Sequence, residues 1–384
     1  MTTLVQQEIL NKIKSAFKEK KYIPLHAPIF IGNENKYVKE AIDSTFVSSV
    51  GSFVDKFEAD LAMITGAKHA VAIVNGTNAL HLALLLAGVE NNDEVLSQSL
   101  TFIATCNAIS YINAKPTFVD IDKDTLGMSP ALLSSFLTKN AEIRDDGYAY
   151  NKKTARRIRA CVPMHTFGLP CRIDEIVQIC ASWNIKVVED AAESLGSYYK
   201  GLHTGLFGNL GVFSFNGNKI VTCGGGGAIV TNDSEIAKKA KHLSTQAKIP
   251  HPWAFEHDAV GFNYRMPNLN AALACAQLEL LETFINNKRA LAEEYQDFFS
   301  KLDISAVKEI KEARSNYWLN AILLKDIHER DEFLKYTNDN EVMTRPVWTL
   351  MHKLPMFSDS FYTDLTNSDW VSERLVNIPS SVRV

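Results

Sequence analysis

The sequence lacks the features that mark several specialised classes of protein. Basic residues are not in excess, because 40 lysines and arginines stand against 44 aspartates and glutamates, and a net charge of −4 does not favour nucleic acid or an anionic membrane as a partner. No apolar run reaches the length of a membrane span, and the first residues lack the basic and apolar regions of a signal peptide. We therefore expect a cytoplasmic globular protein.

Cysteine and nucleotide-binding motifs are also scarce. The six cysteines form no CxxC pair and show no zinc-like spacing with histidine, so we expect reduced core residues and no metal site. No GxGxxG motif follows a strand-like run, which argues against an NAD-binding domain. Lys219 lacks the upstream glycine spacing and the following serine or threonine of a P-loop. The cysteines are Cys106, Cys161, Cys171, Cys180, Cys223 and Cys275.

Strand-like and helix-like stretches alternate along the first two thirds of the chain. This order predicts an α/β fold with a mostly parallel central sheet flanked by helices, and ligands of such sheets lie beyond the carboxyl ends of the strands. The expected strands cover residues 69–75, 94–97, 116–122, 158–164, 185–190, 212–215 and 228–231, and the expected helices cover 79–87, 101–112, 173–183 and 234–246.

The ends of the chain indicate further units. Apolar residues at helical spacing predict an amphipathic helix near residues 4–20, followed by short helices at 35–43 and 53–65, whereas the polar stretch 140–155 reads as a loop. A long helical region after Pro267, a strand at 317–324 and a helix at 330–338 indicate a smaller α+β domain. We expect an N-terminal helix in 1–22, a large domain in 23–255 and a small C-terminal domain in 256–384.

Lys219 lies in the polar loop between two of these apolar strands. A lysine that a tight turn holds partly out of water can act as a nucleophile towards carbonyl groups. The four glycines of residues 224–227 follow it and allow backbone to approach a ligand closely. Taken alone, the same pattern also suits a surface lysine in a glycine-rich hairpin.

Two other segments supply partners for Lys219. Gly76 and Thr77 turn a strand directly into a helix, and a helix start binds phosphate through its backbone amides. Asp190 ends another strand. A nucleophilic lysine, a carboxylate at a strand end and a phosphate cradle are the groups that pyridoxal phosphate requires, because they bind its aldehyde, its ring nitrogen and its phosphate.

Seven motifs in order resemble the DegT/StrS family of nucleotide-sugar aminotransferases, which are pyridoxal phosphate enzymes of fold type I. The resemblance runs from about Ile23 to the C-terminus. The motifs are Asn75-Gly-Thr-Asn-Ala-Leu-His-Leu-Ala-Leu84, Thr101-Phe-Ile-Ala-Thr105, Pro116-Thr-Phe-Val-Asp-Ile-Asp122, Glu189-Asp-Ala-Ala-Glu-Ser194, Phe213-Ser-Phe-Asn-Gly-Asn-Lys219, Gly261-Phe-Asn-Tyr-Arg-Met266 and Thr344-Arg-Pro-Val-Trp348.

The resemblance assigns roles residue by residue. Lys219 matches the lysine that forms the internal aldimine, and Asp190 matches the partner of the pyridine nitrogen. Phe102 matches the aromatic ring that stacks on the cofactor. The remaining cofactor contacts implied are Gly76, Thr77 and Ser214 at the phosphate, Glu193 near the phenolic oxygen, Asn216, and Asn263 at the phosphate of a neighbouring subunit. The last contact implies a homodimer with shared active sites.

Two positions depart from the commonest family pattern. Glu193 stands where many members have glutamine, and Asn216 stands where many have histidine. A carboxylate near the phenolic oxygen of the cofactor is unfavourable unless it is protonated or paired, which leaves the role of Glu193 open. The N-terminal helix, the glycine run and the aromatic loop 249–266 resemble the subgroup that acts on UDP-4-keto sugars in legionaminic acid and bacillosamine-type pathways.

The resemblance implies a two-stage transamination in bacterial surface amino-sugar biosynthesis. L-Glutamate gives its amino group to the cofactor, and pyridoxamine phosphate then aminates a 4-keto-6-deoxy nucleotide sugar, expected to be a UDP-2-acetamido-4-keto-2,6-dideoxyhexose. Lys219 argues against the dehydratases of the family, which carry histidine there. Amination of a 3-keto sugar or a cyclitol ketone, and a non-catalytic regulatory protein of the same fold, stay open as alternatives.

Several other polar residues are weaker candidates. A solvated loop is the simplest interpretation of the basic cluster Lys152, Lys153, Arg156, Arg157 and Arg159, with a contact to a diphosphate as the alternative. A structural role is the simpler interpretation for five further side chains, with substrate contact as the alternative. These are His165, His251, His257, Arg345 and His352.

Overall fold

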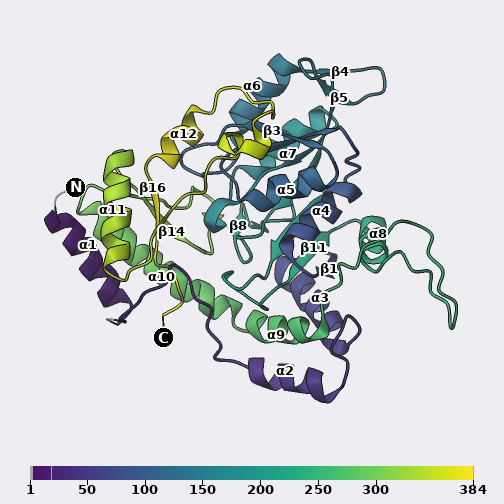
Figure 1. Ribbon diagram of the computed structural model, residues 1–384, viewed down its shortest axis with the longest axis horizontal. Coiled ribbons are helices and arrows are strands. Elements are labelled where there is room, and N and C mark those ends of the chain that lie inside the picture. Colours follow the sequence, from purple (N-terminus) through teal and green to yellow (C-terminus); the bar gives the residue numbers. More distant parts are fainter. Residues whose placement is uncertain (1–2, 19, 384) are drawn as a thin grey trace.

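The computed structural model describes residues 3–18 and 20–383 (Figure 1). Its centre is a sheet in the order β1-β11-β10-β7-β6-β2-β3, in which β11 is antiparallel to both of its neighbours and the other pairs are parallel. The expected mostly parallel sheet is therefore confirmed. The strands are β1 (His69–Ile73), β2 (Glu94–Gln98), β3 (Lys115–Val119), β6 (Arg157–Val162), β7 (Lys186–Asp190), β10 (Leu210–Ser214) and β11 (Gly227–Thr231).

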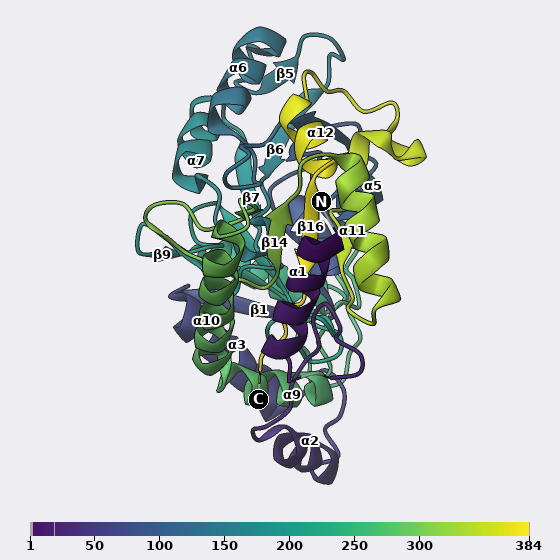
Figure 2. The ribbon, with the colours of Figure 1, turned by 90° about the vertical axis from the view of Figure 1, so that its left-hand side faces the viewer.

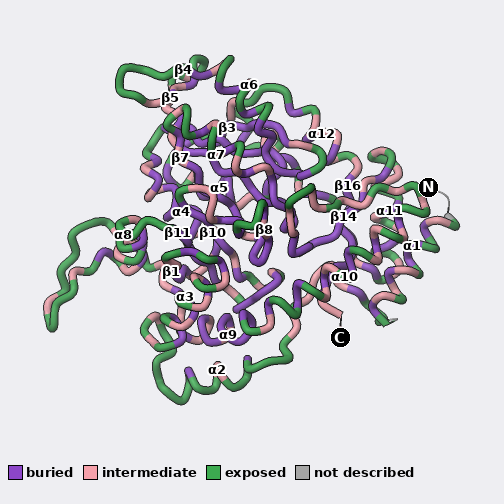
Figure 3. Tube along the Cα trace, turned by 180° about the vertical axis from the view of Figure 1, so that it is seen from behind, coloured by how far each residue is buried: buried purple, intermediate pink, exposed green. Residues whose placement is uncertain are grey.

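Helices cover both faces of this sheet because successive side chains of each strand point to opposite sides. In β10, Val212 packs in one apolar cluster and Phe213 in another. The first cluster contains α4 (Gly76–Leu86), α5 (Ile103–Tyr111) and α8 (Ser234–Ser244). The opposite face is covered by α3 (Ser52–Thr65), α6 (Pro130–Asn140), α7 (Ile173–Ser182) and α9 (Asn268–Leu278). Figure 3 shows the resulting buried centre.

A second, antiparallel sheet lies in the C-terminal part of the chain, in the order β12-β14-β16-β15. Its strands are β12 (Ser305–Ala306), β14 (Asn320–Leu323), β15 (Arg345–Pro346) and β16 (Leu375–Ile378). The helices α10 (Leu281–Ser300) and α11 (Ile327–Asp339) share an apolar cluster with it, and so does α1 (Thr3–Ala16) (Figure 2). The N-terminal helix thus packs against the C-terminal sheet. The domain limits at 22 and 255 remain a prediction.

Smaller elements complete the fold. A three-stranded sheet, β13-β8-β9, joins the two parts of the chain because β13 pairs with β8. The remaining elements are α2 (Glu34–Asp43), β8 (Tyr198–Tyr199), β9 (Leu202–His203), β13 (Ala313–Arg314), α12 (Thr366–Ser372) and the 3₁₀ turns η1 (Thr166–Gly168), η2 (Met351–Lys353) and η3 (Pro355–Phe357). Within the described ranges, no helix has the length and apolar character needed to cross a membrane.

Two expectations from the sequence were wrong in detail. The stretch 140–155 is not a plain loop, because β4 (Ala141–Ile143) and β5 (Ala149–Asn151) form a hairpin that extends the main sheet. The expected strand at 317–324 begins only at Asn320, since Tyr317 has a φ of 45°, which no strand residue adopts. The expected helical region after Pro267 is confirmed and consists of two helices, α9 and α10.

Candidate active site

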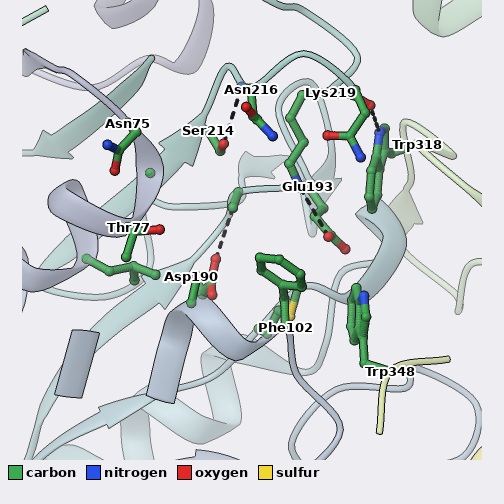
Figure 4. Close-up of a pocket in the computed structure, with 16 residues that line it drawn as sticks. Asn75, Thr77, Phe102, Asp190, Glu193, Ser214, Asn216, Lys219, Trp318 and Trp348 are labelled. Carbon is green, nitrogen blue, oxygen red and sulfur yellow. Dashed lines mark hydrogen bonds and ion pairs between the residues drawn. The ribbon is translucent and has the colours of Figure 1, made fainter. Parts of the chain in front are cut away.

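A pocket lies beyond the carboxyl ends of β7 and β10, beside the N-terminus of α4 (Figure 4). Its volume of about 280 Å³ is close to the lower end of the roughly 300–1,000 Å³ typical of small-molecule sites. The lining residues are Asn75, Gly76, Thr77, Leu80, Phe102, Ala104, Met164, Asp190, Ala192, Glu193, Ser214, Asn216, Asn218, Lys219, Trp318 and Trp348. Eight of the nine residues expected at the site are among them, and Asn263 is not.

Lys219 extends into this pocket from the loop between β10 and β11. The loop folds back on itself, because the N–H of Lys219 donates to the carbonyl of Asn216 at 3.0 Å and Gly224 has a φ of 79°. The side chain is only 12% exposed. Its Nζ lies 3.1 Å from Oε1 of Glu193 and 4.1 Å from the ring centroid of Trp318. The amine is therefore held between a carboxylate and an indole face rather than in bulk water.

The paired carboxylate of Glu193 is itself buried. Its second oxygen, Oε2, accepts the backbone N–H of Phe167 at 2.9 Å. Burial raises the pKa of Glu193, and the nearby charge of Lys219 opposes that rise. A carboxylate was expected to be tolerated here only if protonated or paired, and the structure supplies the pairing.

Asp190 ends β7 and faces the same pocket from a buried position. Its Oδ2 accepts the hydroxyl of Thr105 at 2.7 Å, and its Oδ1 accepts the N–H of Ala192 at 3.2 Å. Burial raises the pKa of Asp190, while these two hydrogen bonds and the charge of Lys219 act in the opposite direction. The pocket therefore holds two buried carboxylates, of which only Glu193 contacts the lysine amine.

The start of α4 forms the opposite wall of the pocket. Its N-cap, Asn75, accepts the N–H of Asn78 at 2.8 Å, whereas the amides of Gly76 and Thr77 come too early in the helix to have an acceptor within it. A Cβ on Gly76 would lie 2.9 Å from Cβ of Ser214, so only glycine lets the helix start approach this strand end. Two amides with the hydroxyls of Thr77 and Ser214 are a donor set suited to a phosphate.

Aromatic side chains close the side of the pocket away from this helix start (Figure 4). Phe102 is 46% exposed and makes an edge contact with Trp348, with ring centroids 5.8 Å apart. Trp318 donates its indole N–H to the carbonyl of Asn218 at 2.7 Å. Sequence reasoning missed both tryptophans and Met164 as lining residues. Trp348 ended one of the quoted motifs, but Trp318 gave no signal beyond its place next to an expected strand.

Asn263 and Asn216 have different positions relative to the pocket. Asn216 lines it, and its N–H is 3.4 Å from the hydroxyl of Ser214. Asn263 is exposed, and its Oδ1 accepts the guanidinium of Arg265 at 3.2 Å. It precedes α9 and lies outside this chain's pocket, so its expected contact with a neighbouring subunit stays a prediction.

None of the five weaker candidates lines the pocket. His165 is buried and bonded to Glu189, with 3.0 Å between Nε2 and Oε2. His257 bonds to the carbonyl of Gln246, Arg345 to Asn338, and His352 to Ser99. His251 belongs to the exposed loop after α8, where its Nδ1 accepts the N–H of Ala254 at 2.8 Å. These contacts support the structural interpretation.

The basic cluster lies at the wrong end of the sheet for a diphosphate in this pocket. Arg157 is the first residue of β6, whereas Met164, just past the other end of that strand, lines the pocket. The guanidinium of Arg157 is paired with Asp93 at 2.8 Å and with Glu90 at 2.9 Å. The six cysteines are free and buried, as expected. No group of three or more potential metal ligands occurs among the residues described.

Comparisons with known proteins agree with this site. The model of the DegT/DnrJ/EryC1/StrS aminotransferase family matches residues 29–384. The chain is 38% identical to GDP-perosamine synthase of Escherichia coli O157:H7 over 94% of its length and 93% of that protein. It is 36% identical to the putative pyridoxal phosphate-dependent aminotransferase EpsN of Bacillus subtilis (strain 168), over 92% and 89% of the two chains.

A solved structure gives the same result for the fold. The aminotransferase TlmJ of Streptoalloteichus hindustanus superposes with a TM-score of 0.84 at 25% identity, over 94% of this chain and 93% of that one. The expected fold class is thereby confirmed. The chain belongs to the DegT/DnrJ/EryC1/StrS aminotransferase family and is a pyridoxal phosphate-dependent sugar aminotransferase.

Proposed function

We propose that this enzyme transfers the amino group of L-glutamate to the 4-keto group of a 6-deoxy nucleotide sugar, a UDP-2-acetamido-4-keto-2,6-dideoxyhexose. The observation that carries the aminotransferase part is the placement of the Lys219 amine, 3.1 Å from Glu193, in one pocket with Asp190 and the start of α4. The N-terminal helix, the glycine run and the aromatic loop 249–266, which resemble the subgroup that acts on UDP-4-keto sugars, favour the UDP-linked substrate.

The residues present suit pyridoxal phosphate. Gly76, Thr77 and Ser214 would hold its phosphate, because backbone amides and hydroxyls at a helix start favour an anion. Asp190 would keep its ring nitrogen protonated, and Phe102 would pack on its ring. When bound, this cofactor supplies an aldehyde and an electron-withdrawing ring that stabilises negative charge on the carbon next to the transferred nitrogen.

The chain's own groups handle the protons and exclude water. Lys219 is the only amine among the lining residues, so it would move the proton between the carbon of the bound amine and the cofactor. Trp318, Trp348 and Phe102 form an apolar wall beside it. That wall would shield the reacting atoms from hydrolysis and strengthen the charge interactions inside the pocket.

A GDP-linked sugar is a second candidate for the substrate. It is favoured by the 38% identity to a protein named GDP-perosamine synthase. One experiment tests the proposed function and separates the two candidate substrates. Purified protein with pyridoxal phosphate should show a yellow absorption band, which excess L-glutamate should bleach. We expect the UDP-linked 4-keto sugar to restore the colour faster than the GDP-linked one, and the reverse order would assign the GDP-linked substrate.

The outcome of this experiment also tests the remaining alternatives. A 3-keto sugar or a cyclitol ketone that alone restores the colour would replace the 4-keto sugar as substrate. A protein that binds the cofactor but shows no change with any amino donor would be a regulatory relative instead of an enzyme. A related amino donor that bleaches the band faster than L-glutamate would replace the donor without changing the reaction class.

We also propose a homodimer in which each subunit completes the other's site. Large apolar side chains are exposed along the segment around α2, where Phe46 is 58% and Val50 67% exposed. The exposed loop after α8 projects from the body of the molecule (Figures 1 and 3), and its Trp253 is 80% exposed. Exposed large apolar side chains on these two segments favour a protein interface. This loop leads to Asn263, the residue expected to reach across.

A further inference from the structure

We propose that Glu193 is a catalytic residue of this enzyme: it accepts a proton from the ammonium of Lys219 when that lysine bonds to the cofactor's aldehyde, and it returns the proton to the departing oxygen. This inference rests on the proposed function, because it requires Lys219 to bind the cofactor covalently. It gives Glu193 a role towards the lysine rather than towards the phenolic oxygen of the ring.

The first support is that the structure fixes the Glu193 carboxylate against the amine. Oε1 lies 3.1 Å from Nζ of Lys219, and Oε2 accepts the N–H of Phe167 at 2.9 Å. Phe167 reaches this position with a φ of 58°, a left-handed conformation that costs a residue other than glycine on the order of 1 kcal/mol. Strained backbone that aims a donor at a buried carboxylate is typical of functional sites.

The backbone of Glu193 is fixed as firmly as its side chain. The amide of Asn316 donates to the carbonyl of Glu193 and to that of Leu195, both at 2.9 Å. Gly168 packs so closely against Asn316 that a Cβ there would lie 1.9 Å from its Oδ1. The carboxylate therefore has little freedom to leave the amine, and a fixed distance of this size is what proton transfer requires.

The second support is that no other group in the pocket is placed to take this proton. Asp190 is the other buried carboxylate, but its two oxygens accept Thr105 and Ala192, and no hydrogen bond joins it to Nζ among the described residues. The Nζ of Lys219 also lies over the ring of Trp318, but an indole ring does not accept a proton from an ammonium. His26, whose ring centroid is 6.4 Å from that of Trp318, does not line the pocket. Burial and the charges of Lys288 and Lys219 lower its pKa.

The third support is electrostatic. Burial and the charge of Asp190 favour the protonated form of Glu193, whereas the positive charge of Lys219 favours the ionised form. Once the ammonium gives up its proton, its positive charge no longer lowers the pKa of Glu193, and the protonated carboxyl is favoured. The pair is thus built to exchange a proton in both directions at nearly constant pocket charge.

The step balances without another reactant. The Glu193 carboxylate removes one proton from the Lys219 ammonium, and the nitrogen lone pair forms a bond to the aldehyde carbon as the C=O π electrons move to oxygen. A second proton on nitrogen moves to that oxygen with the help of the same carboxyl. The nitrogen lone pair then forms the second C–N bond as the C–O bond breaks, and the oxygen leaves as water with the proton that Glu193 held. Two of the three ammonium protons leave in the water, the third stays on the positively charged nitrogen, and Glu193 ends ionised as it began.

The test measures covalent capture of the cofactor, which needs neither sugar nor amino donor. Protein freed of cofactor is mixed with saturating pyridoxal phosphate, samples are reduced with borohydride at intervals, and the mass of the peptide that contains Lys219 is measured. We expect Glu193→Gln to capture the cofactor at least about 100-fold more slowly than wild type, the lower end of the usual effect of a general acid–base group. Asp190→Asn, which removes the same charge but leaves Glu193 beside Nζ, should slow capture far less.

A second variant separates proton transfer from packing. Glu193→Ala should be slow, formate should restore its capture rate, and neutral formamide of nearly the same size should not. Capture by Glu193→Gln within about threefold of wild type overturns the inference, as does equal rescue by formate and formamide. Wild-type protein that captures no cofactor at Lys219 overturns both this inference and the proposed function. Glu193-dependent capture without amination of any nucleotide sugar retains the inference and removes only the substrate.

Discussion

The hydroxyl of Thr105 donates a hydrogen bond to Oδ2 of Asp190 at 2.7 Å, which connects α5 to the end of β7. This bond is one of the interactions that oppose the rise in the pKa of Asp190 caused by burial. Thr101 extends this series of hydrogen bonds, because its hydroxyl lies 2.9 Å from that of Thr105. Thr105 thus helps to keep ionised the carboxylate that is proposed to face the cofactor's ring nitrogen.

We predict that Thr105→Val, which keeps the shape but removes the hydroxyl, weakens the site. The pKa of Asp190 should rise, and a buried hydrogen bond to a charged group contributes about 1.5–3 kcal/mol. Cofactor affinity, measured by titration of the yellow band, should fall by roughly 10- to 100-fold at neutral pH. Thr105→Ser is the control and should stay near wild type. Equal affinity of the valine and serine variants would contradict the proposed role of this hydroxyl.

Lys219→Ala should abolish turnover and covalent capture of the cofactor. It should also lower the free energy of unfolding of the cofactor-free protein, because Glu193 would lose its partner, and an unpaired buried charge costs about 3–5 kcal/mol unless it is neutralised by protonation. Lys219→Arg, which retains a positive charge near Glu193, should also be inactive but more stable than the alanine variant. Urea unfolding and turnover of both variants test this, and an active arginine variant would remove Lys219 from its role.

Gly76→Ala should reduce cofactor affinity with little effect on the rest of the fold. The added Cβ would lie 2.9 Å from Cβ of Ser214, so α4 and β10 must separate by a few tenths of an ångström. Overpacking of this kind costs about 1–3 kcal/mol, which corresponds to roughly 5- to 150-fold in affinity. The double variant Gly76→Ala/Ser214→Gly relieves the contact and should recover more affinity than Gly76→Ala/Ser214→Ala, which retains the Cβ.

The proposed shared sites predict complementation between two defective subunits. Lys219→Ala lacks the lysine, and Asn263→Ala lacks the group expected to reach the neighbouring cofactor. Refolded together, they should form hybrid dimers in which the intact lysine meets an intact Asn263, with activity above that of either parent. A mixture of Lys219→Ala and Lys219→Arg is the control and should stay inactive. Light scattering should show a dimer for each variant, and a monomer would contradict the proposal.

The two buried carboxylates predict a pH dependence of stability in the cofactor-free protein. The pKa values of Asp190 and Glu193 are raised in the folded state, whereas in the unfolded chain they return to about 3.9 and 4.3. The folded protein therefore binds more protons, so this contribution to stability is fully present below the unfolded pKa and is lost as pH rises through the folded pKa. Urea midpoints of wild type should fall relative to those of Glu193→Gln as pH rises above about 4.

The sequence predicted the parts of the site that depend on strand ends. Gly76 and Lys219 come after apolar strands and Asp190 ends one. Parallel strands bring such positions to one edge, so their meeting could be expected without a structure. The β4–β5 hairpin was missed because its polar residues carry no apolar period, and the pairing with β6 that stabilises it is a tertiary effect.

The aromatic wall and the setting of Glu193 could not be predicted in the same way. Trp318 and Trp348 come from the C-terminal part of the chain, about 100 residues or more from Lys219, and no local pattern fixes such a contact. The amide of Phe167 reaches Glu193 only because of its left-handed backbone, a conformation that the sequence of a phenylalanine does not favour.

The packing of α1 against the C-terminal sheet has a consequence for synthesis of the chain. Ile9 and Ile13 of α1 are buried in one cluster with residues of α10, α11 and β16, so these partners of the first helix are translated much later than the helix itself. At about 5–20 residues per second, the roughly 265 residues between α1 and α10 correspond to roughly 13–53 s during which this apolar face lacks its helical partners. The apolar face of α1 is therefore exposed to chaperones until α10 and α11 have been made, and β16 completes the small sheet afterwards.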